Sequence, residues 1–577
     1  MAATLAIARV LGRALVPALL AVSVAGAAPP IFPLKDVRAG QQAVGRTVFS
    51  GSRVEEFQVE ILGVLENIGP KQSIILARLS GGPLAQTGVM QGMSGSPVYI
   101  DGKLVGAVAL GFEMAKEPIC GIRPIEEMLR VEPDPKPDPR QRASTTAPGQ
   151  FLSGDTRLTE IATPVSFSGF SAATLDHFAP QLRQLGLDPR QGVSGGGRLP
   201  DALGDPKKIE PGSMISVQLL SGDMNVGADG TVTMIDGNKV YAFGHRLLSA
   251  GETELPFARS EVLALLPNLS SSFKISQPRE WMGTITEDRN SAISGLTGRR
   301  ARLTPIEIKI GSNSYRMGLV QDPVLTPLVA QMAVFSAIDG TARTIGAASY
   351  TVQGKLNFEG GSVKVDNVYS GDVSVSSLAS AGIATPLSYA LASGFDALKL
   401  KDISIEIGVL DQRRQMQIAG IVAPRRVRPG EEIEIAVVLS GENGVETTRR
   451  VRYRVPVGAE AGPLYLTAGD ATSANFVDLQ AASGAAFRSP SQVLDMLNGL
   501  RTNTSAYLRI WRSGPTYTVE GRDLPDPPAS VAMILGRSQP GGPNVLNVRG
   551  AELAEMEVAS GGNVVTGSRT IQIEVAD

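Results

Sequence analysis

The stretch Gln91-Gly92-Met93-Ser94-Gly95-Ser96-Pro97 is followed by the apolar run Val98-Tyr99-Ile100 and the turn Asp101-Gly102-Lys103. This pattern predicts a tight bend that leads into a β-hairpin. A serine at such a bend has small neighbours, which let a substrate carbonyl approach its hydroxyl, and backbone N–H groups that can face a developing oxyanion. We therefore take Ser94, at an exposed turn, as a candidate nucleophile. The structural alternative is a glycine-rich turn that only joins two strands.

The bend belongs to a longer set of motifs, which covers roughly the first half of the chain. They are Glu56-Phe57-Gln58-Val59-Glu60-Ile61, Thr87 to Pro97, Gly102-Lys103-Leu104-Val105-Gly106-Ala107-Val108, Val240-Tyr241-Ala242-Phe243-Gly244-His245, Gly283-Thr284-Ile285 and Asp288-Arg289-Asn290. Together they resemble the SpoIVB family of serine peptidases. The bend itself resembles the Gly-x-Ser-Gly-x-Pro turn of chymotrypsin-like proteases, and it is not the Gly-x-Ser-x-Gly elbow of α/β-hydrolases. The resemblance implies a chymotrypsin-type fold.

The chain has only two histidines as candidates for a general base. His177 lies off the apolar face of a helix predicted from Ser171 to Leu187, which favours a solvent-exposed side chain. His245 ends a strand after a glycine, and the residues alone allow two interpretations. It is either a buried histidine satisfied by a backbone carbonyl or a base, since imidazole titrates in the right pH range. The resemblance implies the base.

The same resemblance implies a serine endopeptidase that forms an acyl-enzyme. Ser94 is then the nucleophile, and the backbone N–H groups of Gly92 and Ser94 form the oxyanion hole. The substrate is a protein or peptide, with the chain itself as one possibility. The rival hypothesis is an inactive pseudoprotease that serves as a binding or structural module.

Two departures from the family pattern favour that rival. The position that matches the family's aspartate is occupied by Ser80, which can orient an imidazole but cannot stabilise its charged form as a carboxylate does. Asp236, Glu252 and Glu254 lie near His245 in sequence as substitutes, and nothing selects among them. The order of the blocks is also inverted, because the family's His block precedes its Ser block. A circularly permuted two-barrel module would allow Ser94 and His245 to meet in a cleft between the barrels.

Composition limits the other function classes. The 577 residues predict three or four domains, and 43% apolar residues with 64 glycines and 38 prolines indicate a turn-rich, mainly β protein. A net charge of −2 argues against nucleic acid or an acidic membrane as the main partner. Two histidines and one cysteine do not supply a zinc site, and no phosphate-binding glycine motif stands in a strand-to-helix setting. We therefore expect no metal and no cofactor. The single cysteine, Cys120, is predicted to be a small buried hydrophobe.

The N-terminus predicts export. Arg9 and Arg13 precede an apolar run from Ala14 that ends in Ala25-Gly26-Ala27, the pattern of a cleaved secretory signal. We expect no other stretch long and apolar enough to span a membrane, and hence no stable membrane insertion after cleavage. In a bacterium the mature protein would be periplasmic or extracellular.

We predict a mainly β fold with a chymotrypsin-like two-barrel module, followed by β-rich accessory domains with a few helices. Phe57, Val59 and Ile61 alternate with polar residues, which predicts a strand, and Asp236-Gly237 predicts a hairpin turn. Ser489-Pro490 predicts the start of a helix. The predicted segments are a signal peptide (1–27), a Ser-bearing half (28–131), a proline-rich linker (132–150), a His-bearing half (151–321), a middle β-rich region (322–424) and a C-terminal sandwich-like region with a helix (425–577).

Overall fold

The computed structural model describes most of the chain. The predicted signal peptide lies outside the described residues, and so does most of the predicted linker, whose last residue begins strand β7 (Gln150–Ser153). The described ranges are 29–69, 71–112, 115–130, 150–153, 156–161, 163–191, 199–341, 348–371, 375–484, 487–519, 522–525, 527–537 and 545–576.

Six antiparallel strands close into a first barrel. Strand β4 pairs with both β1 and β5, which closes the order β4-β1-β2-β3-β6-β5 into a ring. Phe57, Val59 and Ile61 are buried in its core, so the alternation predicted there is confirmed. The predicted Asp101-Gly102 turn joins β4 to β5, and both residues have the positive φ that suits a twisted hairpin. The elements are η1 (Leu34–Asp36), β1 (Gln42–Val48), β2 (Val54–Gly69), β3 (Gln72–Ser80), α1 (Leu84–Thr87), β4 (Pro97–Ile100), β5 (Lys103–Phe112), β6 (Ile119–Pro124) and α2 (Ile125–Leu129).

A second barrel follows with the same construction. Its six antiparallel strands take the order β12-β13-β16-β15-β14-β11, and pairing of β11 with β12 closes the ring. The predicted Asp236-Gly237 turn joins β12 to β13, with Asp236 opposite Lys239. Two closed six-stranded barrels confirm the mainly β, chymotrypsin-like fold class. The strands are β11 (Met214–Gly222), β12 (Asn225–Asp236), β13 (Lys239–Ala242), β14 (Gly251–Leu266), β15 (Phe273–Arg289) and β16 (Ala292–Thr297).

Both barrels are extended by further strands. Strand β8 (Thr156–Glu160) pairs with the end of β5 and carries β7 on its outer side. The sheet of the second barrel continues past β12 and β11 into a 13-stranded sheet, which runs through residue 321, the predicted limit of the His-bearing half. The added strands are β9 (Thr163–Ser168), β10 (Leu187–Gln191), β17 (Thr304–Ile310), β18 (Asn313–Leu319), β19 (Ala348–Phe358), β20 (Gly361–Gly371) and β21 (Leu400–Leu410).

The apolar core of this extended sheet includes residues of the helices α3 (Ala172–Gln184), α4 (Leu325–Thr341) and α5 (Val375–Ala392). The predicted start of α3 is confirmed, because Ser171 caps it by accepting a hydrogen bond from the N–H of Thr174. Short 3₁₀ turns flank the region, η2 (Pro206–Lys208) and η3 (Asp396–Leu398).

Helix α5 corrects one expectation from the sequence. By length and composition it is apolar enough to cross a membrane, although we expected no such stretch beyond the N-terminus. The pattern was missed because α5 reaches this hydropathy with small residues and no charge rather than with a run of large apolar ones. Half of the helix is buried, with Ala379, Ile383 and Leu387 in the core that it shares with α4.

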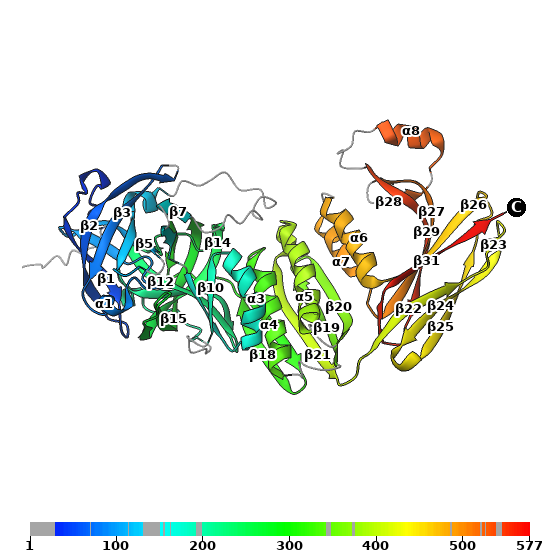
Figure 1. Ribbon diagram of the computed structural model, residues 1–577, viewed down its shortest axis with the longest axis horizontal. Coiled ribbons are helices and arrows are strands. Elements are labelled where there is room, and N and C mark those ends of the chain that lie inside the picture. Colours follow the sequence, from blue (N-terminus) through cyan, green and yellow to red (C-terminus); the bar gives the residue numbers. More distant parts are fainter. Residues whose placement is uncertain are drawn as a thin grey trace, which may run out of the picture.

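Two sheets face each other in the C-terminal part. They share one apolar core that includes Ile435, Leu466 and Ile510, so the region is a sandwich. It lies at the opposite end of the molecule from the barrels, with α3, α4 and α5 between them (Figure 1). Its strands are β22 (Gln415–Val422), β23 (Arg426–Val427), β24 (Glu432–Gly441), β25 (Glu446–Arg454), β26 (Gly462–Asp470), β27 (Ser505–Val519), β28 (Arg522–Pro525), β29 (Val545–Ala559), β30 (Val564–Thr566) and β31 (Ser568–Val575), with η4 (Glu442–Gly444).

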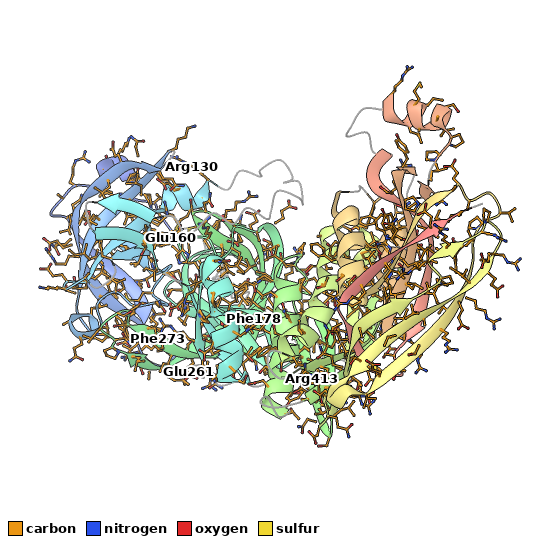
Figure 2. The ribbon with its side chains drawn as sticks, turned by 45° about the vertical axis from the view of Figure 1, so that its right-hand side comes forward. Arg130, Glu160, Phe178, Glu261, Phe273 and Arg413 are labelled. Atoms are coloured by element: carbon orange, nitrogen blue, oxygen red, sulfur yellow. The ribbon has the colours of Figure 1, made fainter. Side chains whose placement is uncertain are left out.

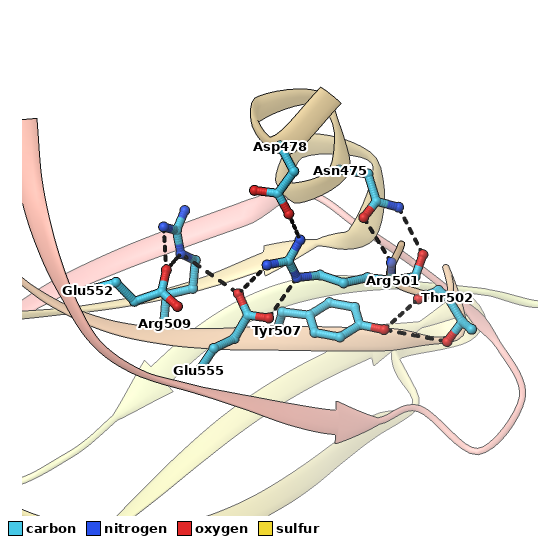
Figure 3. A network of polar contacts seen from close by, with 8 residues as sticks. All are labelled: Asn475, Asp478, Arg501, Thr502, Tyr507, Arg509, Glu552 and Glu555. Atoms are coloured by element: carbon cyan, nitrogen blue, oxygen red, sulfur yellow. Dashed lines mark hydrogen bonds and ion pairs between the residues drawn. The ribbon is translucent and has the colours of Figure 1, made fainter. Parts of the chain in front are cut away.

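Three helices accompany the sandwich: α6 (Ala471–Gly484), α7 (Pro490–Asn498) and α8 (Ala529–Arg537). Helix α7 was predicted from its Ser489 cap, and it buries Val493, Leu494 and Leu497 in the core of the 13-stranded sheet. Arg501 attaches α6 to the sandwich, since its guanidinium pairs with Glu555 at 2.6 and 2.9 Å and also with Asp478 (Figure 3). Helix α7 therefore belongs to the core of the 13-stranded sheet, whereas α6 is held to the sandwich by Arg501.

Candidate active site

Ser94 lies in the turn between α1 and β4, where the two barrels meet. The expectation of an exposed turn is wrong, because Ser94 and Ser96 are both 0% exposed. Strand β12 of the second barrel covers the turn at close range. A Cβ on Gly95 would lie 2.1 Å from the carbonyl oxygen of Thr231, and Gly95 has a φ of +92°, so only glycine fits there.

The two serine hydroxyls of the turn differ in their partners. Ser96 Oγ donates to Thr47 Oγ1 at 3.1 Å, inside the first barrel. Ser94 Oγ is buried and has no hydrogen-bond partner among the described residues. A buried hydroxyl without a partner costs stability, and such groups call for a functional explanation. Ser96 therefore serves the structure, whereas the hydroxyl of Ser94 is free for chemistry.

The backbone N–H groups of the turn fall into two sets. Those of Gly92 and Ser94 donate to no described residue. These two groups are the donors that the sequence predicts for the oxyanion hole, and such donors must be unoccupied before substrate arrives. The other N–H groups donate to backbone carbonyls: Gln91 to Ser272 (2.9 Å), Met93 to Met90 (3.1 Å), Gly95 to Val108 (2.8 Å) and Ser96 to Met93 (2.9 Å).

His245 follows β13 in a turn with an unusual backbone. Phe243 and Gly244 both have positive φ, +71° and +69°. For phenylalanine this conformation costs of order 1–3 kcal/mol, so the surrounding packing must hold it. Part of that packing is the serine turn, since a Cβ on Gly95 would lie 2.5 Å from the nitrogen of Phe243. The carbonyl of Val108 accepts from Gly95 and lies 3.4 Å from the Cβ position of Gly244. The fold thus brings the Ser94 turn and the His245 turn into contact.

The ring of His245 is held in one tautomer. Its Nδ1 lies 2.7 Å from the carbonyl oxygen of Arg246, and a carbonyl can only accept, so Nδ1 carries the proton of the neutral ring. Nε2 is then an acceptor, as a general base requires. Nε2 of His245 and Oγ of Ser94 are both buried, and neither has a hydrogen-bond partner among the described residues. No direct hydrogen bond therefore joins the two atoms.

The charge of His245 is set by its surroundings. Burial lowers its pKa, and the negative charge of Glu160 opposes that effect. Glu160 is on β8, beside the first barrel, and pairs with the Arg246 guanidinium at 3.6 Å (Figure 2). The imidazole is therefore neutral, and able to accept a proton, at neutral pH.

Asp288 organises the loop after His245. This carboxylate is 1% exposed and accepts from the N–H groups of Leu247 (2.8 Å), Leu248 (2.7 Å) and Ala250 (3.1 Å). Burial raises its pKa, and these three N–H groups act in the opposite direction. The sequence placed Asp288 in a matching block but gave it no role.

Lys274 is buried under the serine turn. It is 2% exposed, and its Nζ donates to Thr47 Oγ1 at 2.7 Å, the atom that also accepts from Ser96. Its stem lies 3.3 Å from the Cβ position of Gly92. Burial lowers its pKa to about 7. No pattern in the sequence identified this lysine.

A cleft of about 600 Å³ opens beside the paired turns. It is lined by Gln91, which lies shortly before Ser94 in the chain, and by Glu160, whose charge acts on His245. Ser94 and His245 themselves do not line it. Arg190 also lines the cleft; its guanidinium donates to Gln91 and Asp188 and lies 4.8 Å from the centre of the Phe273 ring. The buried pair is therefore adjacent to the cleft, and a substrate needs a local opening to reach it.

The positions considered for a third catalytic group do not contact His245. Ser80 is exposed at the end of β3, and Asp236 and Glu252 are exposed as well. Glu254 instead accepts from the N–H of Arg302 at 3.3 Å. The partner of Nδ1 is a backbone carbonyl, and the carboxylate that acts on the ring is Glu160, which lies far from His245 in sequence.

The remaining candidates lie elsewhere. His177 stacks on Phe335 of α4, and its Nε2 lies 3.1 Å from Ser377 Oγ of α5, away from the barrel interface. Cys120 is fully buried in the first barrel, and burial raises the pKa of its thiol. Within the described ranges, no three His, Cys, Asp or Glu side chains are grouped as a metal site.

Comparison with known proteins identifies the first barrel. Residues 21–129 match the family model described as SpoIVB peptidase S55. This region is SpoIVB-like. The match spans Ser80, Gly92 and Ser94 and ends before the second barrel, so the SpoIVB-like region contains the serine turn but not His245. No curated protein and no solved structure matched the chain.

Proposed function

We propose that the protein is an exported serine endopeptidase in which Ser94 attacks the substrate and His245 is the general base. One observation carries this proposal: the SpoIVB-like serine turn and the His245 turn are in contact, through Gly95 and Phe243, and neither reacting atom has a hydrogen-bond partner among the described residues. The substrate would be a protein or peptide entering from the adjacent cleft. Export rests on the N-terminal sequence pattern.

The chemistry follows from the protonation states. Nε2 of His245 accepts the proton of Ser94 Oγ as that oxygen bonds to the substrate carbonyl carbon. The carbonyl oxygen becomes an oxyanion, which the N–H groups of Gly92 and Ser94 stabilise. His245 then returns the proton to the leaving amine, and water releases the acyl group by the same steps. The carbonyl of Arg246 keeps the ring in the required tautomer.

A second candidate function has its own support. Ser94 is fully buried, no hydrogen bond joins it to His245, and the family's acid position holds Ser80. These features favour a pseudoprotease, in which the two barrels serve as a binding or structural module. The two candidates differ in one measurable property, the reactivity of Ser94.

A fluorophosphonate probe tests the proposal, because it needs an activated serine and no known substrate. We expect the wild-type protein to be labelled and Ser94→Ala to lose labelling by at least about 10³-fold. His245→Ala should lose it by a similar factor, because the two residues act as a unit. Ser96→Ala should label at a rate close to wild type, since its hydroxyl bonds Thr47.

The outcomes separate the two candidates. A wild-type protein that is folded but resists the probe would support the pseudoprotease. Equal losses from Ser94→Ala and Ser96→Ala would contradict the choice of Ser94.

A further inference from the structure

Strand β12 of the second barrel contacts the serine turn through two threonines. The N–H of Thr231 donates to the carbonyl of Ser94 at 2.9 Å, and its Oγ1 donates to the carbonyl of Gly92 at 2.8 Å. Thr233 Oγ1 donates to the carbonyl of Gly95 at 2.7 Å. Both threonines are 0% exposed. Thr231 therefore bonds the two residues whose N–H groups are unoccupied.

These bonds fix the peptide planes on either side of one oxyanion donor. The Gly92 carbonyl belongs to the plane between Gly92 and Met93, and the Ser94 carbonyl belongs to the plane between Ser94 and Gly95. The plane between Met93 and Ser94 carries the free N–H of Ser94. The carbonyl of this plane, that of Met93, accepts from the N–H of Ser96 at 2.9 Å, and Thr231 holds the plane on either side. The N–H of Ser94 therefore cannot turn away without breaking a hydrogen bond, and Thr231 fixes the two planes between which it is set.

The hydroxyl of Thr231 has no other function in the packing. Valine and threonine both suit a buried strand position, and among the residues that the structure describes the Oγ1 of Thr231 bonds only the Gly92 carbonyl. Gly92 needs such a partner, because it has a φ of +90° and is not held by an element of regular structure. A positive φ is easily adopted by glycine and as easily lost.

We propose that Thr231 is a positioning residue, which holds the N–H group of Ser94 in the orientation that an oxyanion needs. The N–H of Gly92 belongs to the plane between Gln91 and Gly92, whose carbonyl accepts from the backbone N–H of Lys274 at 3.2 Å, also in the second barrel. The second barrel then supplies both the base and the geometry of the oxyanion hole in the first barrel. This inference rests on the proposed peptidase function.

The test is the saturation kinetics of fluorophosphonate labelling on the full chain. In this reaction Ser94 Oγ bonds to phosphorus, fluoride leaves and the serine proton passes to His245, while the phosphoryl oxygen occupies the oxyanion hole. Thr231→Val removes the hydroxyl with little change in volume. We expect its maximal labelling rate to fall about 10- to 100-fold, with half-saturating concentration nearly unchanged, because misplaced donors act on the transition state.

Two variants give the controls. Thr231→Ser keeps the hydroxyl and should label within about threefold of wild type. Thr326→Val removes an equally buried threonine hydroxyl on α4, outside both barrels, which donates to the carbonyl of Val320 at 2.6 Å and accepts from the N–H of Asp322 at 2.8 Å. It should lower the melting temperature as Thr231→Val does and leave the labelling rate of folded protein unchanged.

Each result decides the inference. A folded Thr231→Val that labels at the wild-type rate, or a Thr231→Ser that is equally impaired, would overturn it. If Thr231→Val does not fold, Thr231→Ala makes the same test, because it keeps the backbone bond to Ser94. A wild-type protein that is not labelled would refute the proposed function itself, which is a different failure.

Discussion

The two barrels have the same number of strands and the same closure, but they bury different side chains. The first barrel buries one pair of charges, Arg123 and Glu127, which lie 3.5 Å apart. Among the described residues, the second barrel buries four Asp, His or Lys side chains, and none of them forms an ion pair with a described residue. They are Asp229, His245, Lys274 and Asp288. A buried group without an ionic partner destabilises a fold, so such groups concentrate at functional sites.

The protonation of these groups shows the same contrast. Burial raises the pKa of Asp229 to about 6 and lowers that of Lys274 to about 7. Both groups are therefore near their titration point at neutral pH. The first barrel presents the SpoIVB-like serine turn on a largely apolar core. The second barrel supplies the groups that position the serine turn and the His245 loop, and it buries groups that change protonation near neutral pH. Burying these groups lowers its own stability. Three substitutions, at Asp288, Lys274 and Glu160, test this division, and a fourth, at Asp229, is a control.

Asp288→Asn should have the largest of these effects. An amide offers one acceptor oxygen and one donor group, so at least one of the three backbone N–H groups after His245 loses its partner. We expect the free energy of unfolding to fall by about 2–4 kcal/mol. The labelling rate of folded protein should fall about 10- to 100-fold, because His245 is no longer held in place.

Asp229→Asn is the matched control for that variant. Asp229 lies in the same barrel, is equally buried and accepts from the hydroxyls of Ser166 and Ser276, both at 3.0 Å. Hydroxyls can rotate to serve an amide, and the bonds of Asp229 run to these serines and not to the loop after His245. Its labelling rate should match wild type. A loss equal to that of Asp288→Asn would show that any disturbance of the second barrel stops the reaction.

Lys274→Met should change the pH dependence of stability. The lysine has a pKa of 10.5 when unfolded and about 7 when folded, so the folded state binds its proton less tightly. This penalty is complete below about pH 7 and is relieved as pH rises toward 10.5. Methionine fills the same space and has no proton to lose.

The measurement is chemical unfolding of both proteins from pH 6.5 to 10. Lys274→Met should be the more stable at pH 6.5, and its advantage should shrink by about 1.4 kcal/mol per pH unit above pH 7. Other groups titrate equally in the two proteins and cancel in the difference. A difference in the free energy of unfolding that stays constant over this range would mean that burial does not lower the pKa of Lys274.

The sequence predicted the local features of this arrangement well. Alternation at Phe57, Val59 and Ile61 and the turns at Asp101-Gly102 and Asp236-Gly237 each depend on neighbours in the chain, and these predictions are confirmed. The burial of Ser94 was missed, because it depends on Thr231, which lies 139 residues after Gly92. A threonine in a strand carries no signal of such a contact.

The polar residues around the serine turn and His245 illustrate the same limit. Asp288 stood in a motif that resembled the SpoIVB family, so a search for its role was possible from the sequence. Lys274 and Glu160 stood in no motif. Their effects come from burial and from the approach of separate strands, and neither property is visible in local sequence. The sequence therefore offers only the acids near His245 in the chain as a third catalytic group, and the structure shows no contact between those acids and His245.

Glu160→Gln should have the smallest effect and decides whether an acid takes part at all. In a complete triad a carboxylate bonds Nδ1, and its loss costs about 10⁴-fold in rate. Here Nδ1 is bonded to the carbonyl of Arg246, and Glu160 acts on the ring only through its charge. That charge raises the pKa of His245 against the effect of burial, so its removal should lower this pKa further. We expect the acid limb of the labelling rate to move to lower pH and the rate at pH 7.5 to change by less than about tenfold. Glu160 would become the third catalytic group if the rate fell by about 10³-fold or more, and the carbonyl of Arg246 would then be an insufficient substitute for a carboxylate.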